Sequence, residues 1–355
     1  MGVGLRSSSR LVWAAALRRL LLRSRFTRTV LVTGHGRIGS SRRRAVLAGR
    51  AAVLRRAVVV LAVLACLLTG APPAYAGESG VLFGALVSTR GTESFTDAIA
   101  RQDAAYGTPA PMPISRVFYR GAVQPWPGNA GLSRRPVVVS FRYLPRDVLA
   151  GKADAALRDW FAHAPSYDVW WSYSHEPEDN VARGEFTAAD YRAAWRRISG
   201  IANAYAPASA RLHSTLILMC YTMNPNSHRT WLDYYVPTAH STIAFDCYNH
   251  ASKQGRYGDP RNIFKPVTDW SAANPSIPWG ISELGSVKVS TDIDGSGRAA
   301  WLRSVGRFLA AQHTARPSTA AIFGIYFDVV GPKGTDYRLT DTASKLAWRD
   351  VVQNY

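Results

Sequence analysis

Residues 167–180 read YDVWWSYSHEPEDN. The stretch begins as an apolar and aromatic run, which predicts a β-strand, and it ends abruptly in a polar cluster that contains His175 and Glu176. A second run of strand type, PWGISELG at residues 278–285, places Glu283 in the same setting 107 residues later. Each stretch therefore predicts a strand that delivers a carboxylate near its carboxyl end.

Short apolar strands alternate with helical patterns along the rest of the chain, which favours βα units and a parallel sheet. Eight strands are expected, at residues 81–89, 114–121, 136–143, 167–174, 212–223, 241–249, 279–284 and 320–329. This is the number that a (β/α)8 barrel, or TIM barrel, requires. We therefore expect one α/β domain over residues 77–355, with the ends of strands four and seven facing each other across the barrel mouth.

The positive charge of the chain is concentrated near its start. The chain has 43 Lys and Arg against 24 Asp and Glu, a net charge of +19 that would suit a nucleic-acid-binding protein. Residues 1–76, however, hold 14 Arg and no acidic residue, which leaves 29 basic and 24 acidic residues in 77–355. That balance is ordinary for a soluble domain, so no nucleic-acid partner is expected.

Residues 1–76 read as an N-terminal extension followed by a secretion signal. Arg55 and Arg56 precede the apolar run AVVVLAVLACLL at residues 57–68, and Ala-Tyr-Ala at 74–76 is a small-x-small cleavage site. Twelve apolar residues are too few to span a bilayer, so we expect a secreted protein without a stable membrane anchor after cleavage. Cys66 raises a lipoprotein alternative, which its poor lipobox VLAC disfavours.

The segment upstream of the signal contains an incomplete dinucleotide-binding motif. Residues 1–56 are either an unusual extension or lie before the true start codon. Within them, VLVTGHGRIG at 30–39 matches the G-x-G-x-x-G dinucleotide fingerprint. The fingerprint requires an acidic residue about 20 positions later, whereas the first carboxylate here is Glu78. We therefore expect no nucleotide cofactor.

Two cysteines follow the signal, Cys220 and Cys247, each in a run of strand type. They form one disulfide if their strands are neighbours, and otherwise they remain two buried thiols. No cluster of Cys and His has metal-site spacing, so no metal ion is expected.

The pair His175-Glu176 after strand four, together with Glu283 in ISELG at strand seven, resembles the clan A glycoside hydrolases. The pattern is most similar to family 26, where a His precedes the acid/base Glu and the nucleophile lies in S-E-[FL]-G. The resemblance spans about residues 80–330. It implies a retaining, endo-type hydrolase of a β-linked polysaccharide, with Glu176 as general acid/base and Glu283 as nucleophile. A retaining enzyme needs its two carboxyl groups about 5–5.5 Å apart.

Supporting residues can be placed at the ends of the other strands by the same rule. Tyr248, at the end of strand six, matches a Tyr that hydrogen-bonds the nucleophile in clan members. Arg120 or Arg142, at the ends of strands two and three, would hold the nucleophile ionised. His175 is either a substrate ligand or structural, and Trp171 either stacks on a sugar ring or packs in the core. Because period-two alternation separates neighbouring side chains, at most one of the Trp pair at 170–171 faces the barrel interior.

The sequence departs from the family in two places. Clan members often carry a Trp at the end of strand eight, where this chain has Tyr-Phe-Asp at 326–328. Family 26 mannanases follow the acid/base with Asn-Gly and an aromatic cluster, whereas residues 177–181 read PEDNV. Glu178 and Asp179 are expected in a loop, where they shape a subsite or face water. The sequence therefore does not choose among β-mannan, β-glucan and β-xylan.

Other classes fit less well. H-E-P-E-D places Asp179 where the zinc motif H-E-x-x-H needs its second His, and DIDGSG at 292–297 lacks the later ligands of a calcium loop. No G-x-S-x-G nucleophile elbow follows the signal. The remaining alternative is a secreted barrel that binds glycans without cleaving them. The partner expected in either case is an oligo- or polysaccharide, and the protein is expected to be a monomer.

Overall fold

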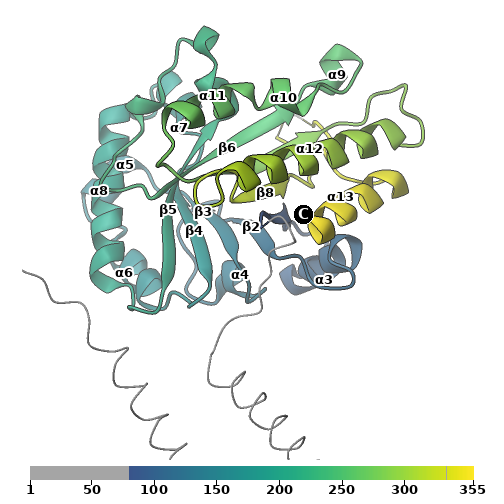
Figure 1. The fold of residues 1–355 in the computed structure, drawn as a ribbon. Helices are drawn as coiled ribbons and strands as arrows, with labels where there is room; N and C mark the ends of the chain where they lie inside the picture. Colours follow the sequence, from purple (N-terminus) through teal and green to yellow (C-terminus); the bar gives the residue numbers. More distant parts are fainter. Residues whose placement is uncertain (1–79, 333) are drawn as a thin grey trace, which may run out of the picture. The chain divides into compact units, whose positions relative to one another are not determined.

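The computed structural model describes residues 80–332 and 334–355. Eight parallel strands form a closed barrel in which each strand pairs with its sequence neighbours and β1 pairs with β8 (Figure 1). The strands are β1 (Leu82–Leu86), β2 (Ile114–Phe118), β3 (Val137–Phe141), β4 (Asp168–Tyr173), β5 (Arg211–Met219), β6 (Thr242–Asn249), β7 (Trp279–Ser286) and β8 (Phe323–Tyr326). The predicted (β/α)8 barrel is confirmed.

Helices follow the strands and surround the barrel (Figure 1). The α-helices are α3 (Phe95–Tyr106), α4 (Gly128–Gly131), α5 (Pro145–Leu149), α6 (Asp154–Ala162), α7 (Pro177–Ala182), α8 (Ala188–Tyr205), α9 (Ala251–Gln254), α10 (Pro260–Ile263), α11 (Lys265–Ala273), α12 (Ser296–Ala315) and α13 (Thr342–Asn354). Three 3-10 turns lie between β5 and β6: η1 (Cys220–Met223), η2 (Pro225–Ser227) and η3 (Trp231–Asp233).

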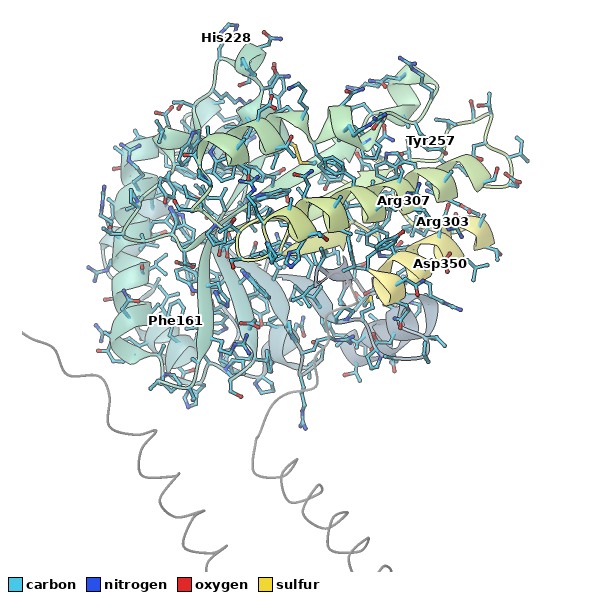
Figure 2. The ribbon with its side chains drawn as sticks, viewed as in Figure 1. Phe161, His228, Tyr257, Arg303, Arg307 and Asp350 are labelled. Carbon is cyan, nitrogen blue, oxygen red and sulfur yellow. A yellow bond between two sulfur atoms is a disulfide. The ribbon has the colours of Figure 1, made fainter. Side chains whose placement is uncertain are left out.

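The strands are apolar on both faces because the barrel has two cores. β3, with the sequence VVVSF, is buried at every residue, as parallel strands covered on both sides require. The smaller core lies inside the barrel and is made of Ile114, Val138, Trp170, Ile217, Ala244, Phe323 and Ile325. The larger core lies between the strands and the helices. It is rich in aromatic rings: the centroid of the Phe161 ring on α6 lies 5.1 Å from that of Trp171 on β4. Figure 2 labels Phe161.

Helix packing closes the barrel where its last and first strands meet. α12 packs along α13, and Arg303 of α12 forms an ion pair with Asp350 of α13 at 2.7 Å (Figure 2). The ring of Trp348 on α13 lies 5.9 Å from that of Phe83 on β1. The C-terminal helix therefore covers the β8–β1 seam with an indole rather than leaving it open to water.

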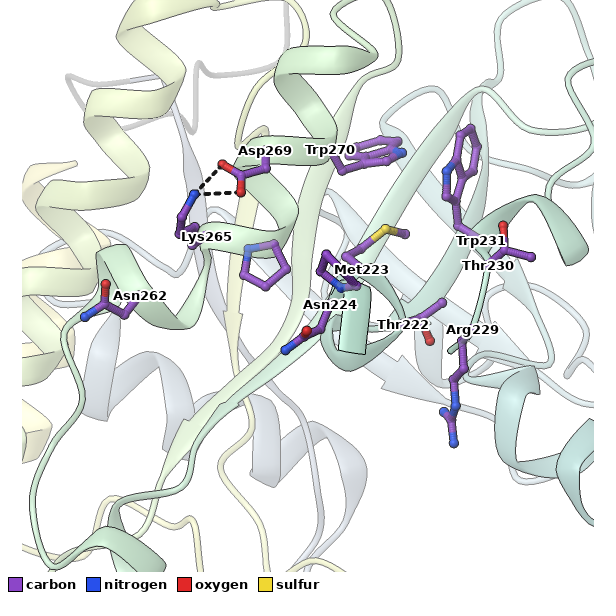
Figure 3. A pocket seen from close by; sticks show the side chains of 12 residues that line it. Thr222, Met223, Asn224, Arg229, Thr230, Trp231, Asn262, Lys265, Asp269 and Trp270 are labelled. Carbon is purple, nitrogen blue, oxygen red and sulfur yellow. Dashed lines mark hydrogen bonds and ion pairs between the residues drawn. The ribbon is translucent and has the colours of Figure 1, made fainter. Parts of the chain in front are cut away.

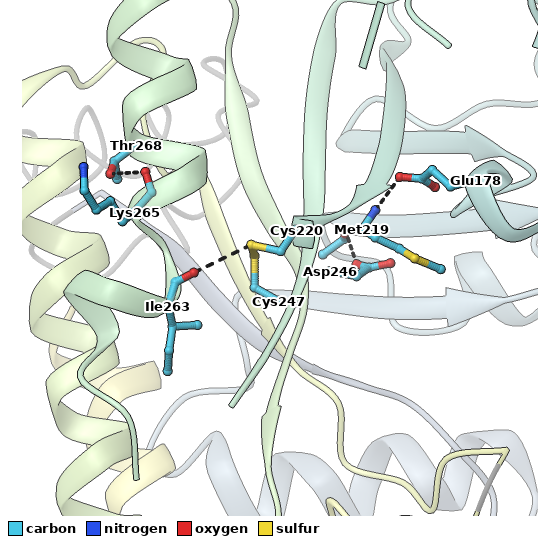
Figure 4. Close-up of a disulfide and its surroundings, with 9 residues drawn as sticks. Glu178, Met219, Cys220, Asp246, Cys247, Ile263, Lys265 and Thr268 are labelled. Atoms are coloured by element: carbon cyan, nitrogen blue, oxygen red, sulfur yellow. Dashed lines mark hydrogen bonds between the residues drawn. A yellow bond between two sulfur atoms is a disulfide. The ribbon is translucent and has the colours of Figure 1, made fainter. Parts of the chain in front are cut away.

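A disulfide joins Cys220, just beyond β5, to Cys247 in β6 (Figure 4). β5 and β6 are paired neighbours in the barrel, so the condition for a disulfide is met. The structure thereby decides between the two states that the sequence left open.

Several predicted boundaries are corrected. The fifth strand ends at Met219, because the chain turns there into η1, and the eighth strand covers only Phe323–Tyr326. Among the described residues, no helix is long and apolar enough to cross a membrane. The predicted signal and the domain boundary after residue 76 lie outside the described residues.

Candidate active site

Glu176 and Glu283 lie at the carboxyl ends of β4 and β7, the rim where barrel enzymes place their active sites. Glu283 lies within β7, and Glu176 lies three residues beyond β4, immediately before α7. Pro177 then begins α7, in the first helical turn where proline is favoured. The abrupt change from the apolar strand β4 to the polar turn HEPED thus places a carboxylate at the barrel mouth.

The turn that carries Glu176 is strained and is held on three sides. Ser174 has φ 45° and Glu176 has φ 49°, both in the left-handed region, which costs an L-residue about 1–2 kcal/mol. The amide of Ser174 donates to the Phe141 carbonyl at 2.8 Å, and that of Glu176 donates to the Ile217 carbonyl at 3.0 Å. The Tyr191 hydroxyl donates to the Ser174 carbonyl at 3.2 Å. Strain held in this way is typical of functional sites.

Glu283 is buried and receives contacts from two other strands. The Tyr248 hydroxyl on β6 donates to Glu283 Oε2. The guanidinium of Arg116 on β2 lies 3.6 Å from Glu283 Oε1. Arg116 is fully buried and also donates to the Ser140 hydroxyl at 2.7 Å. A buried cation of this kind requires an anionic partner, which Glu283 provides.

The surroundings of Glu176 and Glu283 act differently on the pKa values of the two carboxyl groups. Burial raises the pKa of Glu176 to about 8, and the charge of Glu283 adds to that rise. Burial also raises the pKa of Glu283, but the charge of Arg116 and the hydrogen bond from Tyr248 oppose the rise. The environment therefore favours the protonated form of Glu176, whereas the Arg116 charge and the Tyr248 hydrogen bond favour the ionised form of Glu283; such differences assign acid and base roles to paired carboxyls.

A third carboxyl group, that of Asp246, lies beside Glu283 on the neighbouring strand. It is buried and accepts a hydrogen bond from the Ser282 hydroxyl at 2.6 Å. Burial raises the pKa of Asp246 well above its usual range, and the charge of Glu283 raises it further. Burial and the charge of Glu283 thus both favour the protonated, uncharged form of Asp246.

The rings of His175 and Phe118 have centroids 5.0 Å apart, and the Arg116 guanidinium lies over the Phe118 ring, 4.1 Å from its centroid. Burial lowers the pKa of His175 well below its usual value, and the charges of Arg116 and Arg142 lower it further. The imidazole is therefore neutral and can accept or donate a hydrogen bond at the mouth.

The predicted arginines are corrected. β2 ends at Phe118 and β3 at Phe141, so Arg120 and Arg142 lie beyond the strands with exposed side chains. Arg116, inside β2, is the residue that contacts Glu283. One signal was present in the sequence: a single arginine in the apolar strand ISRVF has to be buried and paired.

The prediction of a substrate contact from Trp171 is wrong. Its side chain is 1% exposed and lies between the barrel and the helices, with the Trp195 ring 5.0 Å away. The aromatic side chains near Glu283 are instead Tyr248, Phe327 and Tyr337. Tyr248 lies 5.6 Å from Phe327 and 4.9 Å from Tyr337, and all three are partly exposed. Tyr337 follows β8 in an irregular segment, where strand periodicity gives no signal.

A cavity of about 580 Å³ lies outside the barrel mouth, between η1 to η3 and the helices α10 and α11 (Figure 3). Trp231 and Trp270 meet edge to face at 5.7 Å in its wall. The wall also contains Arg229, which pairs with Asp179 of α7 at 3.2 Å. The cavity is therefore joined to the segment that carries Glu176, although neither glutamate lines it.

Within residues 80–332 and 334–355, no group of three or more His, Cys, Asp or Glu side chains is arranged to hold a metal ion. The ligand-type residues of HEPED are distributed differently. Glu178 is buried on α7, whereas Asp179 faces outward toward Arg229.

Solved structures share this barrel, although no protein-family profile and no curated protein sequence matches the chain. A glucosidase from Croceicoccus marinus has a TM-score of 0.52 at 12% identity, over 80% of this chain and 69% of the other. A broad-specificity endoglucanase of family 5, subfamily 4, from Clostridium acetobutylicum has a TM-score of 0.52 at 11% identity, over 77% and 97%. Glycoside hydrolases use this fold.

A modular endo-β-1,4-mannanase of family 26 from Cellulomonas fimi also shares the barrel, with a TM-score of 0.50 at 12% identity. The alignment covers 76% of this chain and 70% of the mannanase. The neighbours therefore include families 5 and 26, and what they have in common with this chain is the (β/α)8 barrel.

Proposed function

We propose that this protein is a secreted, retaining glycoside hydrolase that cleaves a β-linked polysaccharide by double displacement. The observation that carries the proposal is the contrast between Glu176 and Glu283 at one rim of the barrel. Burial and the neighbouring charge raise the pKa of Glu176 to about 8, whereas Arg116 and Tyr248 stabilise the carboxylate of Glu283. A proton donor and a nucleophile are the two groups that the reaction requires.

In the first step, the Glu283 carboxylate attacks the anomeric carbon while Glu176 gives its proton to the departing glycosidic oxygen. A covalent glycosyl ester on Glu283 results. In the second step, the Glu176 carboxylate takes a proton from water, and that water displaces Glu283 from the sugar. Glu176 ends the cycle protonated and Glu283 ends it ionised, so the resting proton distribution is restored.

The neighbouring residues serve these two groups. Arg116 and the Tyr248 hydroxyl hold Glu283 in place and keep it ionised before attack. As the ester forms, the negative charge on Glu283 falls; burial favours the uncharged form of Asp246 beside it. The neutral imidazole of His175 offers a hydrogen bond to a sugar hydroxyl next to the acid/base.

The substrate class is proposed as a β-glycan cleaved internally, within a family 26-like enzyme. The support is the His-Glu and S-E-L-G patterns around Glu176 and Glu283, together with a barrel shared with an endoglucanase and an endo-mannanase. Secretion is proposed from the signal-like residues 55–76 and agrees with a disulfide, which persists in oxidising compartments.

A panel of soluble β-mannan, β-glucan and β-xylan tests the proposal. The purified protein is expected to release reducing ends from at least one of them. Glu283→Ala is expected to lose that activity while it still binds the same glycan. Glycan binding with no reducing ends from any polysaccharide would instead indicate a non-catalytic barrel. Hydrolysis that survives the loss of either glutamate would contradict the assigned roles.

A further inference from the structure

Glu178 is a buried carboxyl group that the proposed mechanism does not use. It lies two residues after Glu176, in the first turn of α7, and its side chain is only 2% exposed. The sequence HEPEDN predicts a loop in which Glu178 shapes a subsite or faces water, so its burial on a helix is a departure from expectation. A carboxylate is rarely buried without bound partners.

Those partners lie on the next strand and its turn. Glu178 Oε1 accepts a hydrogen bond from the Met219 amide at 2.9 Å and another from the Thr222 hydroxyl at 2.6 Å. Met219 ends β5, and Thr222 belongs to η1. Figure 4 shows Glu178 meeting Met219 close to Cys220, which the disulfide ties to β6. The carboxyl group therefore fastens α7 to a segment that is itself held covalently.

The charged and titratable groups around Glu178 come from four segments. Glu176 and Asp179 lie on its own turn, and Arg229 approaches from the loop between η2 and η3. Tyr191 on α8 and Tyr234 after η3 also lie within its electrostatic reach. Arg229 contacts Asp179 rather than Glu178, at 3.2 Å. The Oε2 atom of Glu178 has no hydrogen-bond partner among the described residues.

We propose that Glu178 is a positioning residue for Glu176: it clamps the acid-bearing turn to β5 and η1, and it sets how firmly Glu176 keeps its proton. The inference rests on the proposed function, because it assigns Glu176 the role of acid. The geometry provides both parts, since the clamp fixes α7, which begins directly after Glu176, to β5 and η1, and the buried carboxyl group of Glu178 lies on the same turn.

The electrostatic part has a definite sign. Burial raises the pKa of Glu176 most, then the charge of Glu283, and then the charge of Glu178. Burial raises the pKa of Glu178 itself to about 7, against the lowering effect of the Thr222 hydrogen bond. Above that pH Glu178 is anionic and opposes ionisation of Glu176. The acid therefore stays protonated to a higher pH than it would with an uncharged neighbour.

Glu178→Gln separates the charge from the clamp, because the amide oxygen of Gln can accept both hydrogen bonds. Its kcat/KM is measured against pH on the glycan that the wild-type protein cleaves. The alkaline limb is expected to move to lower pH by roughly half a unit, with kcat at the optimum within about threefold of the wild-type value. Glu178→Ala loses the clamp as well, and its kcat is expected to fall by about tenfold or more.

Asp179→Asn is the matched control. Asp179 is the next carboxylate in the chain, but its side chain is about half exposed and paired with Arg229, so solvent screens its charge. Its alkaline limb is expected to move by less than that of Glu178→Gln. Equal shifts in the two variants, or no shift in Glu178→Gln, would overturn the proposal. A purely structural Glu178 would lower stability without moving the limb.

A titration that needs no substrate keeps this result separate from the proposed function. Carboxyl carbon NMR follows Glu176 with pH in the wild-type protein and in Glu178→Gln, with Glu176→Gln to assign the signal. A lower Glu176 pKa in Glu178→Gln supports the inference even if no glycan is hydrolysed, in which case the proposed function alone fails. An unchanged Glu176 pKa overturns the inference even if hydrolysis is observed.

Discussion

Arg116 and Tyr248 contact Glu283 from β2 and β6, and together they oppose the effect that burial has on its pKa. Glu176 has a pKa raised to about 8 by burial and by the charge of Glu283. The two glutamates therefore differ in their contacts: Glu283 has a buried guanidinium and a phenol beside its carboxylate. The residue-scale predictions therefore concern Arg116.

Arg116→Met is expected to raise the pKa of Glu283, because burial then acts without the opposing cation. Glu283 has to be ionised to attack, so the acidic limb of kcat/KM against pH should move to higher pH by about one unit. The value at neutral pH should fall roughly 100-fold. A pH–rate profile of the purified variant measures both effects.

Arg135→Met is the control for that substitution. Arg135 is also buried, at 3% exposure. Its ion pair with Asp103 has an N–O distance of 2.7 Å and lies away from the barrel mouth. Its loss should lower stability but leave the acidic limb in place. If the limb of Arg116→Met also stayed in place, Arg116 would not be what keeps Glu283 ionised.

The sequence predicts the glutamates better than it predicts their partners. Glu176 and Glu283 follow from strand ends, and the structure brings Tyr248 to Glu283 as expected. Arg116 was missed because the expectation placed the arginine at the end of the strand, whereas β2 ends at Phe118. Strand boundaries depend on tertiary pairing, which a single sequence does not display.

At the scale of elements, the segment from η1 to η3 connects the mouth to the cavity beside α11. The disulfide between Cys220 and Cys247 closes a loop across this segment. Replacement of both cysteines by Ala should lower the free energy of unfolding by about 3 kcal/mol, since the unfolded chain gains entropy. Denaturant unfolding measures it.

Reductant provides the control for the disulfide. It should destabilise the wild-type protein by a similar amount and leave the double Ala variant unchanged. Equal stability of the oxidised wild-type protein and the variant would contradict the prediction.

A substitution of Trp231 on η3 tests whether the cavity binds part of a long substrate. In the proposed mechanism Glu176 protonates the leaving group, and sugar units on that side are then expected to extend toward α7 and the cavity joined to it through Arg229 and Asp179. Trp231→Ala should lower kcat/KM about tenfold on the polysaccharide, through lost stacking, and leave an aryl glycoside unaffected.

Leu232→Ala is the matched control for Trp231→Ala. Leu232 is the next residue, is 60% exposed and does not line the cavity. Its kcat/KM should be unchanged on both substrates. Equal losses on the polysaccharide and the aryl glycoside in Trp231→Ala would show that the cavity takes no part in binding the chain.

The order of the elements could be predicted from the sequence, because apolar runs and helical patterns alternate eight times. Their lengths could not. The predicted strand at 212–223 runs on into η1, and the predicted strand at 320–329 contains only four paired residues, Phe323–Tyr326. Apolar residues continue past these strands into turns and irregular segments, so hydrophobicity alone extends the prediction too far.

At the scale of the whole molecule, the barrel is shared with glycoside hydrolases at 11–12% sequence identity. One barrel supports many chemistries, so the reaction has to be argued from the residues at its mouth. The central claim is that Glu283 becomes covalently attached to the sugar while Glu176 supplies the proton.

Intact-protein mass spectrometry after incubation with a 2-deoxy-2-fluoro glycoside tests that claim most directly. The glycoside carries a good leaving group and the sugar that the polysaccharide panel identifies. The wild-type protein is expected to gain the mass of one sugar, located by peptide mapping on Glu283, and Glu283→Ala is expected to gain none. A sugar attached elsewhere, or hydrolysis of the natural glycan with inversion at the anomeric carbon, would contradict the account.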